Sequence, residues 1–555
     1  MTQPRAPRKF LVTRHEGAIK WYRQSGHFAR TIEMTHFDTA KVLPGDIVIG
    51  TLPMHQAAAV CAAGARYWHL ALDVPPERRG GELTADDMRA FGARLEEFRL
   101  EWLGVRASRT PEVDEMPTDT GPLPTLHVCV ATGETLANLV PALHMPWDDL
   151  VVLATPEMQD NASHLQLLLA RPEVQRSQPG LAARVHRLDL ASPTTLGVME
   201  FEMRRAAAEL RQRFPEHDMV VNATGGYKFM SLALLDAFRP HARILYCHMQ
   251  QDVMEDVWPR AAQTIALPPD VLDLETQLLG NRTRIAGSRP LDDETLAKVR
   301  ARARITASMA LAREAGTTPR LVSLLHAEGN AAGRTVLPDG SMNRAFNPER
   351  TVLPPRNMVH WQQALLREMN ELGMTVDRSS ADNPWAFAFA DADAAGFAAG
   401  GYLEEFALLS VLDLGLPLCQ LGWGVHVDAL NPLAGRAPRP LNELDIALVW
   451  RNRLLVIECK AGSQLSHSDT SKPQDIVNKL GMLRREKAGP FGSAWLLSRT
   501  PLTTSRHGDV VQRLADLHID GVAGGNALAK LPKRLRQWCG PGVQASTLDW
   551  NALML

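Results

Sequence analysis

The sequence predicts a multidomain α/β protein with a separate sheet in each of three domains. With 555 residues, the chain is long enough for three or four domains. Two stretches in its N-terminal half alternate short apolar strands with helices, which is the pattern of parallel sheets covered by helices. Near the C-terminus, two apolar runs separated by two residues indicate a hairpin in a third sheet.

The composition restricts the functional classes. The formal net charge is −2 and the pI is near 6.8, so any nucleic-acid surface must be a local patch. The six cysteines form no C-x-x-C or Cys/His cluster, which argues against structural zinc and a disulfide framework. No signal-peptide pattern opens the chain, and no apolar run approaches the length of a membrane span. We therefore expect a soluble cytoplasmic protein without membrane contact.

Shifts in composition divide the chain into five parts. A polar, Pro-rich linker, 106–124, separates an N-terminal α/β domain (1–105) from a second α/β domain (125–270). The hairpin belongs to a C-terminal domain (381–555). Residues 271–380 carry helical patterns, and the sequence leaves open whether they form a connecting segment or part of the C-terminal domain.

The N-terminal domain carries polar side chains where its predicted strands end. Its strands and helices are expected at Phe10–Thr13, Asp46–Leu52, Met54–Ala63, Arg66–Leu72 and Thr84–Glu101. Ligands of parallel sheets gather at the carboxyl ends of strands. The candidate residues there are Arg14, His15, Thr51, Arg66, His69 and Arg79. Each has a structural alternative, because an arginine at a strand end is usually solvated and a lone histidine is usually a satisfied, partly buried residue.

The second domain contains a candidate anion site. Its strands are expected at Leu126–Ala131, Leu150–Ala154, Met219–Asn222 and Ile244–His248. The third of these runs into A-T-G-G-Y-K (223–228) and then a helix, so free backbone N–H groups and Lys228 can face a phosphate. The segment matches neither a P-loop nor a dinucleotide-binding fingerprint. A structural turn after a strand is the alternative.

The hairpin of the C-terminal domain brings carboxylates together. With Arg451-Asn452 as the turn, the numbers of paired residues sum to 903, so Asp445 faces Glu458 and Glu443 faces Lys460. A one-residue slip would break this arrangement. Opposed carboxylates repel unless a cation lies between them, and oxygen ligands suit Mg²⁺ or Mn²⁺. An ordinary charged surface hairpin is the alternative.

Further elements follow the hairpin. A helix is expected at Asp475–Lys487, and Ser493–Ser498 is expected to be the last strand of the sheet. Residues Lys530–Trp538 form a basic helix, which either touches a nucleic-acid backbone or presents a solvated face.

The hairpin resembles the PD-(D/E)xK nuclease motif, with Asp445 as the first acid and Glu458-Cys459-Lys460 as E-x-K. The resemblance implies a restriction-endonuclease-like fold, a further acid from an amphipathic helix that begins near Gly400, and a downstream lysine. Glu404 and Lys479 match those positions. The implied metal ligands are Glu404, Asp445 and Glu458, and the implied catalytic set adds Lys460 and Lys479. Tyr402 stands where the family has Trp.

The combination of G-x-L-E, N-E-x-D, I-E-C-K and K-L resembles CRISPR-associated nucleases that carry an N-terminal CARF sensor. The segment N-A-T-G-G-Y-K resembles the CARF motif, although Tyr227 replaces the usual Thr of G-G-T-K. This resemblance implies a Rossmann-like domain that binds cyclic oligoadenylate, expected to be cyclic tetra-adenylate, in a homodimer. The implied ligand-binding residues are Thr132, Thr155, Asn222, Thr224, Gly225, Gly226 and Lys228.

The N-terminal domain resembles a small CRISPR-associated family of the Csx type. The resemblance rests on T-R-H-x-G-A-x-x-W, G-D-x-V-I-G-T-L-P and A-R-Y-x-H-L-x-L-D, which cover nearly the whole domain. It implies a ring nuclease that degrades cyclic oligoadenylate. The sequence thus predicts a self-limiting effector that cuts DNA or RNA. The alternatives are a constitutive restriction or repair nuclease and a binding-only regulator.

Overall fold

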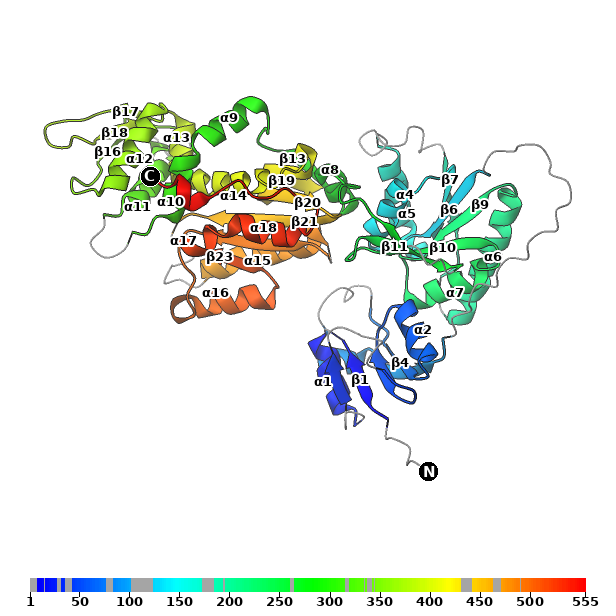
Figure 1. Ribbon diagram of the computed structural model, residues 1–555. Coiled ribbons are helices and arrows are strands. Elements are labelled where there is room, and N and C mark those ends of the chain that lie inside the picture. The colour runs from blue at the N-terminus through cyan, green and yellow to red at the C-terminus, as the bar shows by residue number, and fades with distance from the viewer. Residues whose placement is uncertain are drawn as a thin grey trace. The chain divides into compact units, whose positions relative to one another are not determined.

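The chain forms two compact units in the computed structural model (Figure 1). The first comprises residues 1–118 and 259–261, and the second comprises 119–258 and 262–555. The structure describes residues 7–555 apart from 14, 27–30, 35–41, 76–82, 101–122, 172–183, 193–194, 260–263, 315–318, 334, 337–341, 344, 431–441, 463–470 and 490. Most of the predicted linker lies outside the described residues.

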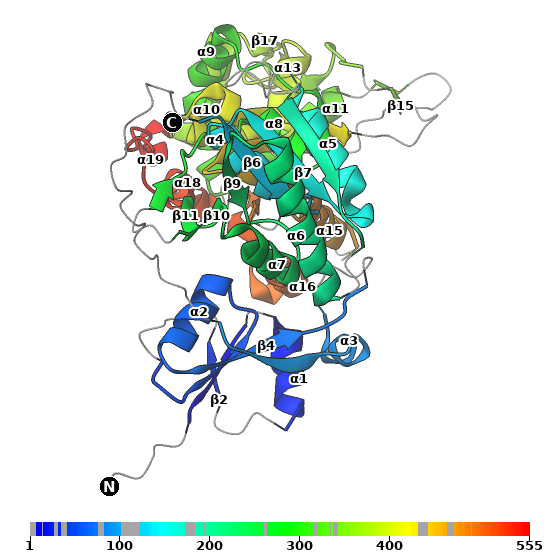
Figure 2. The ribbon, with the colours of Figure 1, turned by 90° about the vertical axis from the view of Figure 1, so that its right-hand side faces the viewer.

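The first unit is a five-stranded sheet in the order β2-β1-β3-β4-β5, parallel except for β5. Figure 2 shows α2 on one side of this sheet and α1 with α3 on the other. Val60 of α2 packs against one face and Tyr22 of α1 against the other. The elements are β1 (Lys9–Val12), α1 (Glu16–Gln24), β2 (Thr31–Met34), β3 (Ile47–Gly50), α2 (Met54–Ala62), β4 (Arg66–Ala71), α3 (Ala85–Ala90) and β5 (Arg94–Phe98).

One element of this unit was predicted wrongly. The helix expected over Thr84–Glu101 begins as expected, because Thr84 and Asp87 form a capping box, but it ends at Ala90. Gly92, with φ +64°, then reverses the chain into the antiparallel strand β5. The charge-rich β5 is an edge strand, and its Glu97 pairs with Arg66 of β4. The elements α1 and β2 were not predicted.

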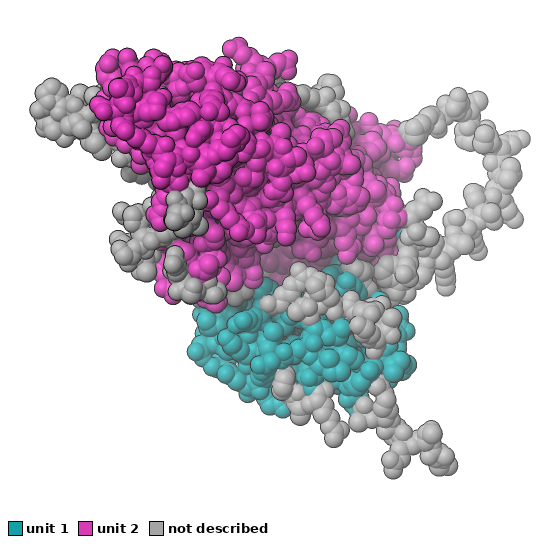
Figure 3. All heavy atoms as spheres, turned by 60° about the vertical axis from the view of Figure 1, so that its left-hand side comes forward, with its two compact units in different colours: residues 1–118, 259–261 teal, residues 119–258, 262–555 magenta. Residues whose placement is uncertain are grey.

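The second unit, coloured separately in Figure 3, contains a sensor lobe and a nuclease lobe. The sensor sheet has the order β12-β11-β10-β9-β6-β7-β8, with β6 to β10 parallel. Its elements are β6 (Thr125–Val130), α4 (Leu136–His144), β7 (Asp149–Ala154), η3 (Pro156–Met158), α5 (Gln159–Leu169), β8 (Val185–Asp189), α6 (Leu196–Arg213), β9 (Asp218–Asn222), α7 (Lys228–Phe238), β10 (Ala242–His248), β11 (Val253–Trp258) and β12 (Thr264–Ala266). The strand order reverses at β6, between β7 and β9, which is where such sheets bind ligands.

The nuclease sheet has six strands in the order β13-β19-β20-β21-β22-β23. The strands are β13 (Thr283–Gly287), β19 (Leu421–Ala429), β20 (Asn442–Trp450), β21 (Arg453–Lys460), β22 (Ser493–Ser498) and β23 (Asp520–Ala523). β22 was expected to be the last strand, but β23 pairs parallel to it and extends the sheet. The short, polar D-G-V-A of β23 carries little strand signal, so only its tertiary pairing identifies it.

Helices cover both faces of this sheet. α14 and α18 share a core with one face, and α8 with α15 shares a core with the other. The covering elements include α8 (Leu274–Gly280), α13 (Ala392–Gly396), η6 (Phe397–Gly401), α14 (Tyr402–Leu412), η7 (Leu418–Gln420), α15 (Ser471–Leu483), η9 (Arg484–Ala488), α16 (Thr504–Asp516), α17 (Gly525–Leu528), α18 (Leu531–Cys539) and α19 (Trp550–Leu553).

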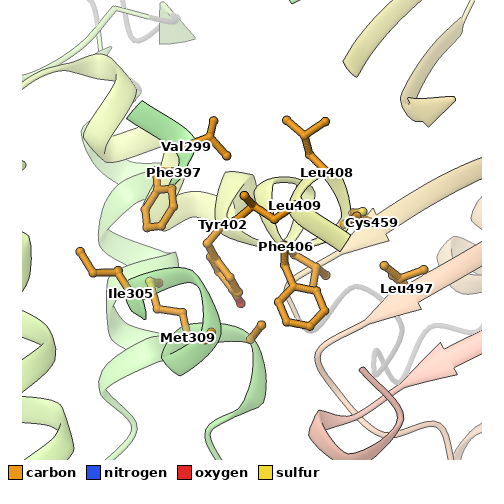
Figure 4. Close-up of a cluster of buried hydrophobic side chains, with 14 of the residues drawn as sticks. Val299, Ile305, Met309, Phe397, Tyr402, Phe406, Leu408, Leu409, Cys459 and Leu497 are labelled. Atoms are coloured by element: carbon orange, nitrogen blue, oxygen red, sulfur yellow. The ribbon is translucent and has the colours of Figure 1, made fainter. Parts of the chain in front are cut away.

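Residues 271–380 pack with the nuclease lobe. Strand β13 pairs with β19, and α10 packs beside α14, with Ile305 and Met309 facing Tyr402 and Phe406 (Figure 4). The remaining elements of this segment and its small sheets are α9 (Asp293–Ala301), α10 (Ala303–Leu311), α11 (Leu321–Ala332), β14 (Thr335–Val336), β15 (Met342–Asn343), β16 (Thr351–Val352), α12 (His360–Glu371), β17 (Thr375–Asp377) and β18 (Phe387–Phe389).

The helix that carries Glu404 differs from the amphipathic segment expected. Most of α14 is buried, including Leu403 and the run from Glu405 to Val411, because it lies between the sheet and α10. The helical run Ala392–Leu412 is long and apolar enough to cross a membrane by length and composition alone, contrary to our expectation, but 67% of that window is buried inside the protein. This is the position of a core helix, with a kink at Gly400.

Candidate nuclease site, ligand loop and N-terminal cluster

The predicted hairpin register is confirmed over the observed ladder. Ile446 pairs with Ile457 and Trp450 with Arg453, so the paired numbers sum to 903. Arg451 and Asn452 have φ values of 53° and 55°, as a tight type I′ turn requires. Arg-Asn is an unusual sequence for that turn. Both turn residues contact the sensor lobe: Arg451 is ion-paired with Asp252, and Asn452 donates a hydrogen bond to Pro268 O.

The acidic end of the hairpin lies just beyond the last ladder pair. The Cys459 N–H donates to Asp445 Oδ2 at 2.7 Å, so the aspartate side chain takes the place of a ladder hydrogen bond. Lys460 Nζ donates to Glu458 Oε1 at 2.5 Å. The lysine therefore pairs with the glutamate of its own strand, whereas the register had placed it opposite Glu443.

The electrostatics of this end indicate an excess of negative charge. Burial, and next the charge of Glu458, raises the pKa of Asp445 well above its usual range. Burial likewise raises the pKa of Glu404. For Lys460, burial alone would lower the pKa, but Glu458 and Asp445 outweigh it, so the pKa is raised and the ammonium stays charged. A cation bound here would relieve the repulsion between the carboxylates.

Glu404 approaches this group from the first turn of α14. Its carboxylate is among the charges that raise the pKa of Asp445, and its Oε2 lies 3.2 Å from Arg289 Nη2. The Arg289 guanidinium lies over the Trp423 ring at 4.8 Å. Arg289 was not predicted as a site residue, because it lies more than a hundred residues before β19 in the sequence. Lys479 lies on α15, which packs against the sheet face that carries Leu454 and Val456 and toward which Glu458 also points, but it forms no ion pair with these carboxylates among the described residues.

The donor set fits a divalent cation in part. Glu458 is 5% exposed and its Oε2 is buried without a hydrogen-bond partner, which suits a metal ligand. Within the described residues, however, no group of three or more His, Cys, Asp or Glu side chains is spaced to hold a metal ion. The expected set of three ligands is not assembled, because Glu404 pairs with Arg289 and Glu458 with Lys460.

His326, which belongs to the segment 271–380, lies close to the end of the strand that carries the E-x-K motif. A Cβ atom at position 462 would lie 2.5 Å from His326 Nε2, so Gly462 permits a close approach of α11 to the end of β21. Burial, and next the charge of Arg499, lowers the pKa of His326. Nothing in the local pattern of α11 indicates that His326 reaches the hairpin, so this residue was not predicted.

In the sensor lobe, the predicted ligand loop is held by a hydrogen-bond network at the strand-order reversal. Asn222 Nδ2 donates to Asn138 Oδ1 at 3.1 Å, and Asn222 Oδ1 accepts from the backbone N–H of Thr224 at 3.0 Å. Thr224 Oγ1 also accepts from the Cys247 N–H at 2.8 Å. Asn222 and Thr224 therefore hold the loop in place. Asn138 was missed because it lies mid-helix in α4.

The two glycines of the loop fit a tightly packed, strongly curved backbone. A Cβ at Gly225 would lie 2.9 Å from Thr132 Cγ2, and Gly226 has φ +92°. Thr155 is buried at the carboxyl end of β7, on the strand beside β6. Lys228, the first residue of α7, is exposed, yet partial desolvation of its ammonium lowers its pKa to about 8. The predicted loop residues thus gather at one edge of the sheet.

In the first unit, a buried tyrosine organises the carboxyl ends of the strands. The Tyr67 hydroxyl donates to Gly50 O at 3.0 Å and accepts from the Leu52 N–H at 3.0 Å, so it holds the backbone on both sides of Thr51. His69 Nδ1 lies 2.9 Å from the same hydroxyl. Burial raises the Tyr67 pKa to about 12. Tyr67 was missed because a buried aromatic residue on a strand usually indicates packing.

Only some of the candidate residues predicted for this unit lie together. His15, the N-cap of α1, and the exposed Thr51 follow β1 and β3 at the edge where His69 lies. Arg66 is the first residue of β4 and is paired with Glu97, so it lies at the other end of the strand. Arg14 and Arg79 lie outside the described residues.

Three family models match this chain. Residues 391–540 match the model described as "Card1-like, endonuclease domain", and residues 183–271 match "Card1 CARF domain". The chain combines a CARF sensor with a Card1-like endonuclease. Residues 10–101 match the family "Putative CRISPR-associated protein (Cas_VVA1548)". The predicted fold class is confirmed, as is the presence of both the sensor and the nuclease domain.

Solved structures with a similar fold share little sequence identity with this chain. Protein VC1899 from Vibrio cholerae is 19% identical with a TM-score of 0.56, over 75% of this chain and 97% of that one. Can2 from Sulfobacillus thermosulfidooxidans, solved with cyclic tetra-adenylate, is 18% identical with a TM-score of 0.52, over 75% and 98%. These similarities support the fold of the CARF–endonuclease part. Among curated proteins, no significant match was found.

Proposed function

We propose that this protein is a cyclic-oligoadenylate-activated, metal-dependent nuclease of type III CRISPR defence, with an N-terminal domain that degrades the activator. The observation that carries the proposal is the convergence of Asp445, Glu458 and Lys460 at one end of a buried hairpin, in a chain that also has a CARF ligand loop. The protein acts in the cytoplasm on DNA or RNA.

At the nuclease site, each residue has a distinct role. Asp445 and Glu458, together with Glu404, would hold Mg²⁺ or Mn²⁺, and the bound ion would supply Lewis-acid polarisation of the phosphate and a more acidic water. Lys460, whose pKa is raised, remains an ammonium at neutral pH and stabilises negative charge that grows on the phosphate. The ion pair with Arg289 holds the Glu404 carboxylate in place before a metal ion binds.

At the sensor site, the ligand loop binds the phosphates of cyclic oligoadenylate. The N-terminus of α7 and the Lys228 ammonium supply positive potential, and Gly225 and Gly226 let the loop pack and turn so that it leads into this helix. The complex of the similar Can2 with cyclic tetra-adenylate supports a ring of four adenylates. A two-fold-symmetric ring matches a homodimer axis, so we propose a dimer with one ring across it.

In the N-terminal domain, the substrate supplies the nucleophile. A ribose 2′-hydroxyl attacks the adjacent phosphorus and loses its proton to a base. The bond from phosphorus to the 5′-oxygen breaks, and that oxygen takes up a proton, which leaves a 2′,3′-cyclic phosphate and a 5′-hydroxyl. His15 and the His69–Tyr67 pair are the candidates for proton transfer, beside the loop at Thr51.

The nuclease proposal is tested by incubating the full chain with Mn²⁺ and plasmid DNA or single strands, with and without cyclic tetra- or hexa-adenylate. Cleavage that requires both the metal and a ring supports it. Cleavage without any ring would favour a constitutive restriction or repair nuclease. Ring binding without cleavage would favour a binding-only regulator.

The ring-nuclease proposal is tested separately. The full chain is incubated with the ring and a chelator, so that metal-dependent cleavage by the nuclease site does not occur. Chromatography should show linear products with a 2′,3′-cyclic phosphate, and His15→Ala or His69→Ala should slow their formation by about 10²-fold or more. As a matched control, His241→Ala alters an exposed histidine of the sensor lobe. An intact ring would leave the domain as a binding or dimerisation module.

A further inference from the structure

A basic hollow lies on the two helices that follow the last strand of the nuclease sheet. It has a volume of about 470 Å³ and is lined by Asn526, Ala527, Lys530, Lys533, Arg534 and Gln537 of α17, α18 and their junction. None of these residues belongs to the predicted catalytic set. We refer to these six residues as the basic hollow.

The hollow begins at the same end of the sheet as the catalytic lysine. Lys460 pairs in register with Ser498, and Ser498 pairs with Ala523. The Gly524 N–H then donates to Ser498 O at 2.9 Å, so α17 starts at that edge. Two strand spacings separate Lys460 from Ala523, which is a distance of about 10 Å.

The helix α18 then runs back along the outer strands. Arg534 lies over the Trp495 ring at 5.4 Å and donates to Gly521 O at 3.3 Å. Farther along, Trp538 Nε1 donates to Ser493 Oγ, at the amino end of β22. The hollow therefore leads away from the catalytic end, along the edge of the sheet.

The charges of the hollow are only partly neutralised. Arg534 is fixed by Trp495 and by an ion pair with Asp520 at 3.4 Å. Lys530 and Lys533 are exposed, and neither has an ion-pair partner among the described residues. In a chain with a net charge of −2, this is a local positive site of the kind that binds phosphates by counterion release.

We propose that the basic hollow binds the sugar-phosphate backbone of the nucleic-acid substrate beside the scissile phosphate. Its start lies about 10 Å from the Lys460 backbone along the sheet, which corresponds to the rise of about three nucleotides at 3.4 Å each along a duplex axis. The lysines act as point charges and read no sequence, while Asn526 and Gln537 can donate to phosphate or sugar oxygens. This inference rests on the proposed nuclease function and assigns part of its substrate track.

The test measures binding without cleavage. In a Glu458→Gln background, the affinity for a fluorescent 20-nucleotide strand and for its duplex is measured from 50 to 200 mM salt. Lys530→Ala/Lys533→Ala should weaken binding about tenfold or more and reduce the slope of log K against log salt by about 1.4–1.8, as expected for the loss of two phosphate contacts. Lys530→Arg/Lys533→Arg should restore most of the affinity.

A matched control removes two cations elsewhere on the same lobe. Arg484→Ala/Arg485→Ala changes η9, which packs with the opposite face of the sheet, and should leave the salt slope unchanged. In the cleaving enzyme, the Lys530/Lys533 variant should raise KM with little change in kcat, since the lost contacts are made equally in the ground and transition states. Affinity for the ring should be unaffected, which verifies folding.

An unchanged salt slope in the Lys530/Lys533 variant, or an equal loss in the Arg484/Arg485 control, would overturn the inference. Failure of the proposed function is a different result, because it would appear as absence of cleavage by the unmodified chain with metal and ring. Nucleic-acid binding is measured without cleavage, so the two failures are distinguishable.

Discussion

The two ends of the β20–β21 hairpin differ in how their charges are balanced. At the acidic end, Asp445 lies beside Glu458, and burial, followed by the charge of Glu458, raises the pKa of Asp445 well above its usual range, which favours the protonated carboxyl in the absence of a cation. At the turn end, Arg451 Nε pairs with Asp252 of the sensor lobe at 2.6 Å, and the buried Asn452 donates to Pro268 O at 3.3 Å. At one end neighbouring carboxyl groups repel one another, and at the other an ion pair joins the hairpin to the sensor lobe.

This difference suggests how a signal can pass between the lobes. Asp252 lies in the turn between β10 and β11, and Cys247 near the end of β10 is hydrogen-bonded to Thr224 of the ligand loop. The Arg451 N–H also donates to Pro269 O at 2.7 Å. The hairpin thus connects, through one ordered ladder, the predicted ligand loop of the sensor lobe with the carboxylates of the candidate nuclease site. Coupling between the two sites requires that both of them bias this shared element.

The largest effect is expected from a change at the acidic end. Glu458→Gln preserves shape but removes the charge of a proposed metal ligand, so cleavage should fall by at least about 10²–10³-fold. Ring binding by calorimetry should stay unchanged. Substantial residual cutting would mean that the metal site lies elsewhere.

A smaller effect is expected from the ligand loop. Lys228→Ala removes a charge-assisted phosphate contact, which should cost about 1.5–3 kcal/mol, or roughly ten- to a hundredfold in ring affinity. Isothermal titration measures this directly. Arg239→Ala, at the other end of the same helix, is the matched control and should bind normally. Equal affinity of both variants would refute the sensor assignment.

A substitution at the turn end of the hairpin should weaken the coupling between the ligand loop and the nuclease site without altering either site. Asp252→Asn removes the ion pair with Arg451, so we expect stimulation of cleavage by the ring to fall by about tenfold, with ring affinity intact. Asp256→Asn breaks a comparable pair with Arg243 that stays within the sensor sheet. If both variants lose stimulation equally, the hairpin contact has no special role.

The smallest effect is a pH dependence of ring binding. The pKa of Lys228 is lowered to about 8 by desolvation, and an anionic ring favours the protonated amine. Affinity should therefore be fully present below pH 8 and decline by up to about tenfold as the pH rises to 9. Lys228→Arg should remove the dependence, because a guanidinium stays charged. A flat profile in the unmodified protein would contradict this role for Lys228.

The sequence predicted the hairpin because register, turn position and polar spacing are all local properties of one segment. It also predicted the ligand loop, since a strand, two glycines and a helix start are contiguous. It did not predict Arg289, His326 or Asn138, which reach the sites from distant elements through tertiary packing. The chain from Thr84 was taken for one helix because the capping box is a strong local signal, whereas the pairing of β5 with β4 is not local.

The most direct test of the account measures cleavage of a labelled nucleic acid by the full chain in Mn²⁺, as cyclic tetra-adenylate is titrated from zero. The account predicts negligible cutting without the ring, saturable cutting with it, and loss of that response in Lys228→Ala at ring concentrations that saturate the unmodified protein. Equal cutting with and without the ring would contradict the claim that the sensor controls the carboxylate end of the hairpin.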